Sequence, residues 1–482
     1  MRLGLLAALG VVLGLVVPGV ATAGPGLVAG VVEDHVRAST LVEAHARMSA
    51  LRLSGYRAVR ITSYWRPGLT TPTEDELRVL QNVGVAGEQS SIRVYVTVMH
   101  QTSQTTPLTD AARAEFASYA AAIVKGTSIR HVIVANEPNL NRFWMPQYAL
   151  DGSSASPAAY LALLAETYDA LKAASPTVRV YGGALSPRGG DRPGGVRPTH
   201  SPTAFIRALG KAYRTSGRDR PAMDTITTHP YPDNSSQPPT FGHPNTTTIG
   251  VADYDKLVAL LAEAFDGTAQ PGSTLPIMYA EFGVESEIPA GKAALYTGAE
   301  PTTTKPVSED TQAAYYEQAL AMAFCQPTVE GMLLFLSRDE RSRPAWQSGL
   351  HYVDGTPKSS RARVSEALDR ATGGSIIRCP GVKLVVRTTS LRFGKRSEAR
   401  RGLFTTSFRC DLDCRYRVRL ENAATGVTKL GTRGTAEVGE LVKADLGYRG
   451  LAPGSYRYTL TLQHPVNPAP PTIRTGPAFA LP

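Results

Sequence analysis

The 482-residue sequence lacks several features that would assign it to a common class at once. Beyond its first 23 residues, no apolar run is long enough to cross a membrane. It contains no Gly-x-Ser-x-Gly elbow and no His-Glu-x-x-His motif, which argues against a secreted esterase or a zinc peptidase. No glycine-rich phosphate loop follows an early strand candidate, which disfavours a doubly wound nucleotide-binding sheet.

Cysteine is also scarce, and the four that occur are not flanked by the histidines that a zinc site would want. Cys410 and Cys414 enclose only three residues, which favours a local disulfide. Cys325 and Cys379 would then form a second bridge, although four cysteines allow three pairings. Structural disulfides in an oxidising compartment are therefore expected.

The N-terminal segment has the pattern of a secretory signal peptide. Arg2 supplies a positive charge, an apolar stretch covers residues 3–17, and Ala21-Thr22-Ala23 resembles a cleavage site. We therefore expect residues 1–23 to be removed and the protein to be secreted, free outside the cell or associated with the cell envelope. An uncleaved membrane anchor is the alternative, but the apolar run is short for a full span.

The residues after this segment alternate between strand and helix patterns. Helical patterns include a capping box at Thr73 and Glu76, a helix opened by Ser156-Pro157, and an alanine-rich stretch from Ser308 to Cys325. Eight apolar runs are strand candidates, at 27–32, 58–62, 92–98, 131–135, 178–182, 225–228, 277–280 and 331–336. This alternation predicts an α/β fold, a (β/α)8 TIM barrel over residues 24–372.

The composition changes after a Gly-rich linker, so residues 373–482 are predicted to form a second unit. From Cys379 onward the chain has 17 Lys and Arg against 7 Asp and Glu, an excess equal to the +10 net charge of the whole protein. Short alternating runs at 382–387, 403–409, 416–420 and 456–462 predict a small all-β sandwich, weakly similar to fibronectin-type or immunoglobulin-like modules.

Two interpretations of the basic C-terminal unit remain open. It is a solvated face without a specific partner, or it is attracted to an anionic cell envelope or acidic polysaccharide. Nucleic acid is not expected, because no recognisable binding motif is present. The unit also contains no tryptophan that would serve as a platform for sugar rings.

Two glutamates lie where predicted strands end. Glu137 follows the run at 131–135, and Glu281 follows the run at 277–280. The 144 residues between them are enough for three βα units of about 40–50 residues, which places Glu137 on strand four and Glu281 on strand seven. The carboxyl ends of barrel strands carry the active site, and glycoside hydrolysis typically uses two carboxyl groups.

With these motifs in place, the barrel resembles glycoside hydrolase clan A, the retaining glycosidases that include family 5 and family 39. Asn136-Glu137-Pro138 matches the acid/base motif of that clan, and the stretch to Trp144 is most similar to family 39. Glu281, within Tyr279-Ala280-Glu281-Phe282-Gly283, stands where the clan has its nucleophile. The resemblance covers roughly residues 27–360 and implies that Glu137 and Glu281 are catalytic.

The resemblance also implies roles in substrate binding and in support of the nucleophile. Arg60 matches an arginine beside the nucleophile, where a fixed cation would keep Glu281 ionised. Asn136 matches the residue that binds the sugar 2-hydroxyl, and His229 and Tyr231 match a His–Tyr pair near the nucleophile. An ordinary ion pair for Arg60 and a packed loop histidine for His229 are the structural alternatives.

Three further candidates carry weaker signals. His100 is a substrate-site candidate or a structural histidine, and Trp144 and Trp346 either stack on sugar rings or anchor loops. Many clan members have a tryptophan on strand eight, but this strand, Leu333-Leu334-Phe335-Leu336, has none. Either Trp346 folds back to replace it, or Arg338 and Asp339 line the site and favour a charged or unusual glycan.

The sequence thus predicts a secreted retaining glycoside hydrolase that cleaves a polysaccharide or oligosaccharide by double displacement. No metal and no organic cofactor is implied. A catalytically inactive barrel that binds glycan or associates with the cell envelope is the alternative, since such a protein would keep the fold while losing the alignment of the two glutamates.

Overall fold

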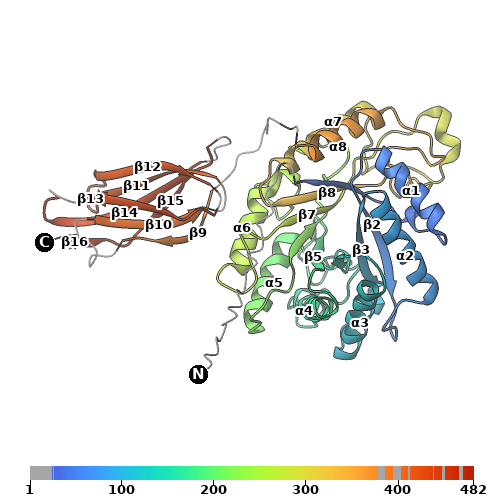
Figure 1. The fold of residues 1–482 in the computed structure, drawn as a ribbon, viewed down its shortest axis with the longest axis horizontal. Coiled ribbons are helices and arrows are strands. Elements are labelled where there is room, and N and C mark those ends of the chain that lie inside the picture. The colour runs from blue at the N-terminus through green and yellow to red at the C-terminus, as the bar shows by residue number, and fades with distance from the viewer. Residues whose placement is uncertain are drawn as a thin grey trace, which may run out of the picture.

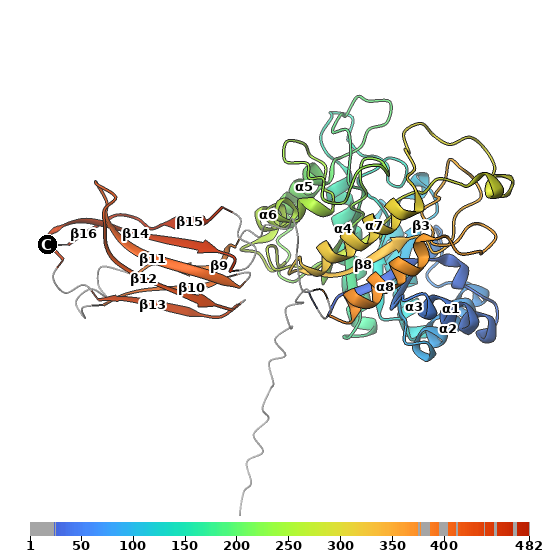
Figure 2. The same cartoon turned by 90° about the horizontal axis from the view of Figure 1, so that it is seen from above.

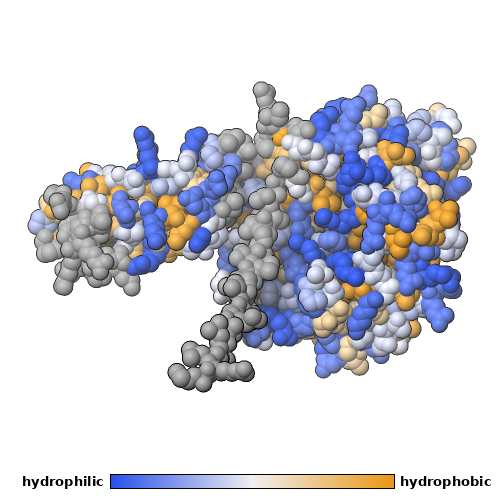
Figure 3. Space-filling view, in the orientation of Figure 1, coloured by the Kyte–Doolittle hydropathy of each residue, from blue (hydrophilic) through white to orange (hydrophobic). Residues whose placement is uncertain are grey.

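The computed structural model describes residues 24, 26–374, 376, 386–394, 403–410, 413–437, 439–447, 451–465 and 470–481. The predicted signal segment at 1–23 lies outside the described residues. Among the helices in the described ranges, none is both long enough and apolar enough to span a membrane. Hydrophilic side chains cover much of the face of the molecule seen in Figure 3, with apolar ones scattered between them.

Eight parallel strands close into a barrel, so the predicted fold class is confirmed (Figure 1). The order follows the chain from β1 to β8, and β8 pairs with β1 to complete the ring. The strands are β1 (Val28–Val32), β2 (Ala58–Trp65), β3 (Arg93–His100), β4 (His131–Val134), β5 (Arg179–Leu185), β6 (Thr225–Thr228), β7 (Ile277–Phe282) and β8 (Val329–Phe335). Each contains most of one predicted run, with ends displaced by three residues or fewer.

An α-helix follows every strand and packs on the outside of the ring, as Figures 1 and 2 show. The helices are α1 (Leu41–Leu53), α2 (Glu74–Gln89), α3 (Asp110–Gly126), α4 (Ser156–Ala174), α5 (Pro202–Thr215), α6 (Tyr254–Phe265), α7 (Glu309–Phe324) and α8 (Ser360–Thr372). Thr73 caps α2 by accepting a hydrogen bond from the backbone N–H of Glu76, and Ser308 caps α7 in the same way. The predicted starts of these helices are therefore confirmed.

Alternate residues of each strand belong to two different cores. Val59 and Ile61 of β2 face the helices in the larger core, whereas Ala58 belongs to a smaller cluster inside the ring. Arg60 has the same parity as Ala58, so it projects into the barrel at its carboxyl end. The other members of the inner cluster are Val32, Tyr95, Ile133, Tyr181, Ala184, Met278, Ala280 and Leu333.

The remaining strands form two antiparallel sheets, which confirms the predicted all-β C-terminal region (Figure 2). One sheet has the order β13-β10-β9, and the other has β12-β11-β14-β15 with β16 paired to β14. The strands are β9 (Thr388–Arg392), β10 (Leu403–Cys410), β11 (Cys414–Asn422), β12 (Thr428–Ala436), β13 (Val442–Gly447), β14 (Gly454–Gln463), β15 (Thr472–Thr475) and β16 (Phe479–Leu481). The predicted run at 382–387 lies outside the described residues except for its last two, which precede β9.

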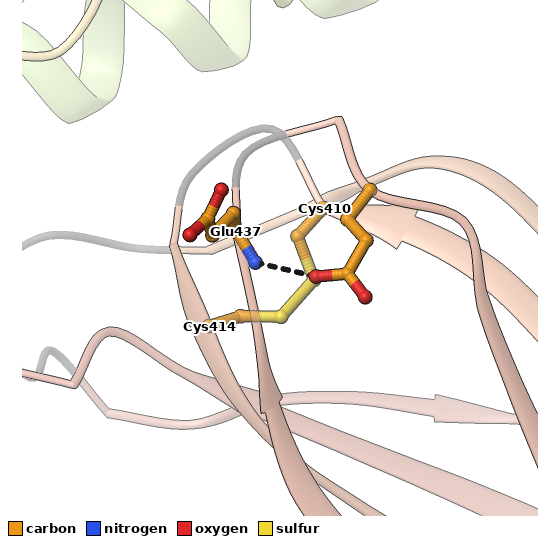
Figure 4. The surroundings of a disulfide bond; sticks show 4 residues. Cys410, Cys414 and Glu437 are labelled. Carbon is orange, nitrogen blue, oxygen red and sulfur yellow. Dashed lines mark hydrogen bonds between the residues drawn. A yellow bond between two sulfur atoms is a disulfide. The ribbon is translucent and has the colours of Figure 1, made fainter.

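A disulfide joins Cys410 and Cys414, as predicted from their spacing. It links the end of β10 in one sheet to the start of β11 in the other, beside a hydrogen bond from the Glu437 N–H to the Glu440 carboxylate (Figure 4). Cys379, the predicted partner of Cys325, lies outside the described residues, so that pairing stays a prediction.

Candidate active site

Glu137 occupies a tight turn directly after β4. Ala135 and Glu137 have φ angles of +64° and +40°, in the left-handed region that residues other than glycine seldom adopt. The Glu137 N–H donates to the carbonyl of Ala184 at the end of β5, at 2.9 Å. Residues keep such φ angles only where neighbouring groups hold the backbone in place, and residues of this kind are frequent at functional sites.

The side chain of Asn139 links this turn to neighbouring loops by hydrogen bonds. Its buried side-chain amide donates to the carbonyls of Ser186 and His200 at 3.2 and 3.0 Å, and its oxygen accepts the Ser186 N–H at 3.0 Å. The amide thereby fixes the loop after β4 to the end of β5. This role of Asn139 was not predicted from the sequence, where the available signal was an asparagine two residues after a strand-end glutamate.

Glu281 is buried near the end of β7, where the pairing register with β8 shifts between Tyr279 and Phe282. This irregularity lets Glu281 line the central cavity directly after Ala280, a member of the inner cluster. Arg60 Nη2 donates to Glu281 Oε1 at 2.6 Å, and the Tyr231 hydroxyl donates to Oε2 at 2.9 Å.

Burial alone would raise the pKa of Glu281, but nearby donors outweigh it. The ring of His229, the guanidinium of Arg60 and the hydroxyl of Tyr231 together lower the pKa of this carboxyl group. Glu281 is therefore held as a carboxylate.

His229, at the end of β6, bridges the two glutamates. Its Nδ1 lies 3.0 Å from Glu137 Oε1 and 3.5 Å from Glu281 Oε2, and the ring is completely buried. On the other side, Arg60 Nη1 lies 3.4 Å from His229 Nε2. A guanidinium only donates, so a hydrogen bond at this contact is accepted by Nε2, and Nδ1 is the ring nitrogen that faces the two carboxyl groups.

These groups open into a cavity of about 1090 Å³ at the carboxyl end of the barrel. Asn136 lines it next to Glu137, and the Asn136 side-chain oxygen is buried with no hydrogen-bond partner among the residues that the structure describes. Arg338 and Asp339 also line it. No group of three or more His, Cys, Asp or Glu side chains is arranged to hold a metal ion in the described part of the chain.

An aromatic wall stands beside Glu281. Tyr231 and Trp346 stack with ring centroids 4.7 Å apart and planes inclined by 28°, and Phe335 of β8 meets the Trp346 ring edge-on at 5.3 Å. Glu340 holds the loop, since its carboxylate accepts the Trp346 N–H at 3.0 Å and its own N–H donates to the Trp346 carbonyl at 2.9 Å. Trp346 thus lines the cavity next to the strand-eight position where tryptophan was missing.

Trp144 and His100 are not among the residues that line this cavity, and their placement matches the structural alternative for each. Trp144 has an exposed fraction of 0% and packs edge-on against His100 and Tyr160 behind the cavity wall. His100 is 2% exposed, and its Nε2 contacts the Phe143 carbonyl at 2.5 Å. The loop after β4 turns the Trp144 ring into the core, where it packs against His100, the last residue of β3.

Another carboxyl group that lines the cavity, Glu285, was missed by the sequence analysis. Glu285 follows Glu281 by four residues, and the Gln347 N–H donates to its Oε2 at 3.2 Å. Burial raises the pKa of Glu285 to about 7. Nearby, Lys358 Nζ donates to Asp339 Oδ1 at 2.8 Å, a fully buried ion pair, so Asp339 is already neutralised by the protein.

The sequence matches no protein-family model and no curated protein. Several solved structures are similar to this chain at low sequence identity. β-Glucuronidase 2 of Bacteroides uniformis has a TM-score of 0.46 and 12% identity over 95% of this chain, which spans only 46% of that protein. GH5_18 from Streptomyces cattleya in complex with GlcNAc has a TM-score of 0.49 and 15% sequence identity. The match covers 72% of this chain and 81% of that protein. A monomeric β-xylosidase from Caulobacter crescentus has a TM-score of 0.46 and 16% sequence identity. The match covers 92% of this chain and 98% of that protein.

Proposed function

We propose that this protein is a secreted retaining glycoside hydrolase acting on a polysaccharide or oligosaccharide. In this proposal residues 1–23 are the signal peptide, residues 24–372 the catalytic barrel, and residues 373–482 a linker and accessory β-domain. The observation that carries it is the placement of two carboxyl groups, Glu137 and Glu281, against one histidine nitrogen in a large cavity at the carboxyl end of the barrel.

The first chemical step forms a covalent glycosyl-enzyme. A Glu281 oxygen attacks the anomeric carbon, the bond from that carbon to the leaving oxygen breaks, and Glu137 gives its proton to the leaving oxygen. Arg60 and Tyr231 support this role, because their donors keep Glu281 ionised before attack.

The second step releases the sugar with its original anomeric configuration. Glu137, now a carboxylate, takes a proton from water, and the water oxygen displaces Glu281 from the anomeric carbon. His229 supports the change of charge at Glu137, because its Nδ1 lies 3.0 Å from the Glu137 carboxyl group. The overall reaction consumes one water and returns both glutamates to their starting states.

The geometry around His229 is compatible with the short separation of carboxyl groups that retention needs. Because one nitrogen contacts both carboxyl groups, their facing oxygens are no more than about 6.5 Å apart. Inverting enzymes need about 6.5–9.5 Å between the groups to admit water, whereas retaining enzymes need about 5–5.5 Å.

The cavity wall also supports a sugar as substrate. The Trp346 ring offers an apolar face beside Glu281, and the unpartnered Asn136 oxygen offers a hydrogen-bond acceptor next to Glu137. An apolar face combined with a few fixed polar groups is the usual composition of a small-molecule site.

The test is a screen of aryl glycosides and polysaccharides with the wild type, Glu281→Ala, Glu137→Ala and the exposed control Glu88→Ala. We expect Glu281→Ala to be inactive and Glu88→Ala to match the wild type. Glu137→Ala should retain more activity on dinitrophenyl glycosides than on alkyl glycosides, because a good leaving group needs no proton. NMR of the first product formed should give the retained anomer.

Activity that survives in Glu281→Ala would exclude the assigned nucleophile, and an inverted first product would exclude double displacement. Binding of a glycan without cleavage of any substrate would favour the inactive glycan-binding barrel instead.

A further inference from the structure

The outer face of the β12-β11-β14 sheet is strongly basic. Along β11, Val418 and Leu420 turn inward and are buried, while Arg415 and Arg417 project outward and are exposed. Arg419 has the same parity and is half-buried. Three arginines therefore follow one another along one side of a single strand.

The neighbouring strands extend this row sideways. In the antiparallel pairing with β12, Arg433 lies directly opposite Arg417, and exposed Lys429 lies on the same edge strand. In the pairing with β14, Arg457 lies directly opposite Glu421. We call these six cations the basic face: Arg415, Arg417, Arg419, Lys429, Arg433 and Arg457. Figure 3 shows hydrophilic side chains projecting from the C-terminal sheets.

Among the paired residues of β11, β12 and β14 on this face, the six cations are accompanied by one carboxylate, and Asp413 and Glu437 lie just beyond the ends of β11 and β12. Glu421 is buried, and it accepts from Thr459 at 2.8 Å and pairs with Arg419 at 3.3 Å. Neither Arg417 nor Arg433 has an acidic partner within the described chain. Because like charges directly opposite one another destabilise a sheet, this pair costs stability, and no ion pair with a described residue compensates for it.

We propose that the basic face binds an acidic polysaccharide whose sugars carry carboxylate groups. Guanidinium groups match carboxylates in a two-pronged geometry, and a row of cations along a strand suits a linear polyanion. The site is separate from the barrel cavity, and the choice of a glycan as polyanion rests on the proposed function of the barrel.

The chemistry of the face disfavours two other ligands. Neutral glycans and single-stranded nucleic acids are usually held by stacking on aromatic rings. The tyrosines of β11 and β14 instead turn inward: Tyr458 is buried, and Tyr416 packs against Phe408 of the opposite sheet. Binding at this face therefore depends on charge.

The test is affinity electrophoresis of the full-length protein through gels containing polygalacturonate or its methyl ester, the same polymer without the charge. The test variant is Arg417→Gln/Arg433→Gln. The matched control is Lys211→Gln/Lys443→Gln, which removes the same charge from exposed residues on α5 and on β13 of the opposite sheet. Duplex DNA and anionic phospholipid vesicles are the competing ligands.

We expect retardation by polygalacturonate, none by the methyl ester, and weakening as salt is raised. The test variant should bind at least about tenfold more weakly, because each lost charged hydrogen bond is worth roughly that factor. The control should bind as the wild type does, and Arg417→Lys/Arg433→Lys should recover part of the affinity because it keeps the charge.

Equal binding to the methyl ester, or equal weakening in the control, would overturn the proposal. Tighter binding to DNA or vesicles would overturn it as well, by assigning the face to another partner. Circular dichroism of each variant separates unfolding from lost binding. Binding does not require a working barrel site, so an inactive barrel leaves this test intact.

Discussion

Tyr231→Phe isolates the hydroxyl group that contacts the proposed nucleophile. The hydroxyl donates to Glu281 Oε2 at 2.9 Å, while the ring of the same residue stacks on Trp346. Phenylalanine keeps the ring and its stacking and removes only the donor. Because this hydrogen bond helps to lower the pKa of Glu281, the substitution should raise that pKa.

The size of the effect follows from the strength of one hydrogen bond to a charged group. Such a bond contributes about 1.5–3 kcal/mol, and one pKa unit corresponds to about 1.36 kcal/mol. The pKa of Glu281 should therefore rise by an amount that corresponds to the energy of this one bond. Since attack needs the carboxylate, the acidic limb of kcat/KM should move to higher pH by about the same amount.

The assay is the pH profile of kcat/KM on whichever glycoside the wild type cleaves, with Tyr213→Phe as control. The Tyr213 hydroxyl donates to the Arg220 carbonyl at 2.7 Å from α5, on the outside of the barrel. The control therefore loses a hydroxyl of the same kind far from Glu281, and its profile should equal that of the wild type.

An unchanged acidic limb in Tyr231→Phe would refute this reasoning, even if activity fell at all pH values. It would mean that the hydroxyl does not stabilise the ionised nucleophile. A limb that moved to lower pH would contradict the sign of the effect.

Three further predictions concern the cavity wall and its supports. Because the pKa of Glu285 is raised to about 7, the stability of the wild type should fall as pH rises from about 4.5 to 7. Glu285→Gln should remove that fall and raise the free energy of unfolding by up to about 3 kcal/mol at pH 8. Urea unfolding at pH 4.5 and at pH 8 measures both effects. A gain already present at pH 4.5 would contradict this. Asp339→Asn should lower the free energy of unfolding by about 3–5 kcal/mol by leaving Lys358 unpaired, and Asp339→Asn/Lys358→Met should recover part of the loss; a double variant no better than the single one would argue against an uncompensated charge. Trp346→Ala should raise KM with little loss of melting temperature, because its ring lines the cavity. Trp144→Ala should lower the free energy of unfolding by about 3–5 kcal/mol, because its ring is fully buried. Equal losses of stability in the two variants would refute the different placement of the two rings.

The strands and the two glutamates were predictable from local patterns. An apolar run that ends in Glu137 or Glu281 identifies both a buried strand and its carboxyl end, and barrel closure brings all such ends together. The role of Arg60 was expected only from the resemblance to clan A, and the structure places it on a strand whose alternate residues face inward.

The direction of aromatic side chains was not predictable in this way. Trp144 and Trp346 both follow polar loop segments, yet one is fully buried and the other lines the cavity. Whether each ring is buried or lines the cavity depends on loop contacts, such as the hydrogen bond that the Glu340 carboxylate accepts from the Trp346 backbone N–H. Glu285 was missed because no strand or motif marks it, and its raised pKa arises from burial by loops distant in sequence.

The contact between Arg60 and Glu281 joins residues separated by 221 positions. A nascent chain therefore presents Arg60 long before Glu281 is synthesised, and no shortened chain that stops before β7 contains the pair. Because β1 must also pair with β8 to close the ring, the proposed site forms only when both ends of the barrel have met. Recovery of the proposed activity after denaturation would consequently measure the closure of the ring. Two separately expressed half-barrels would each be inactive before they are mixed.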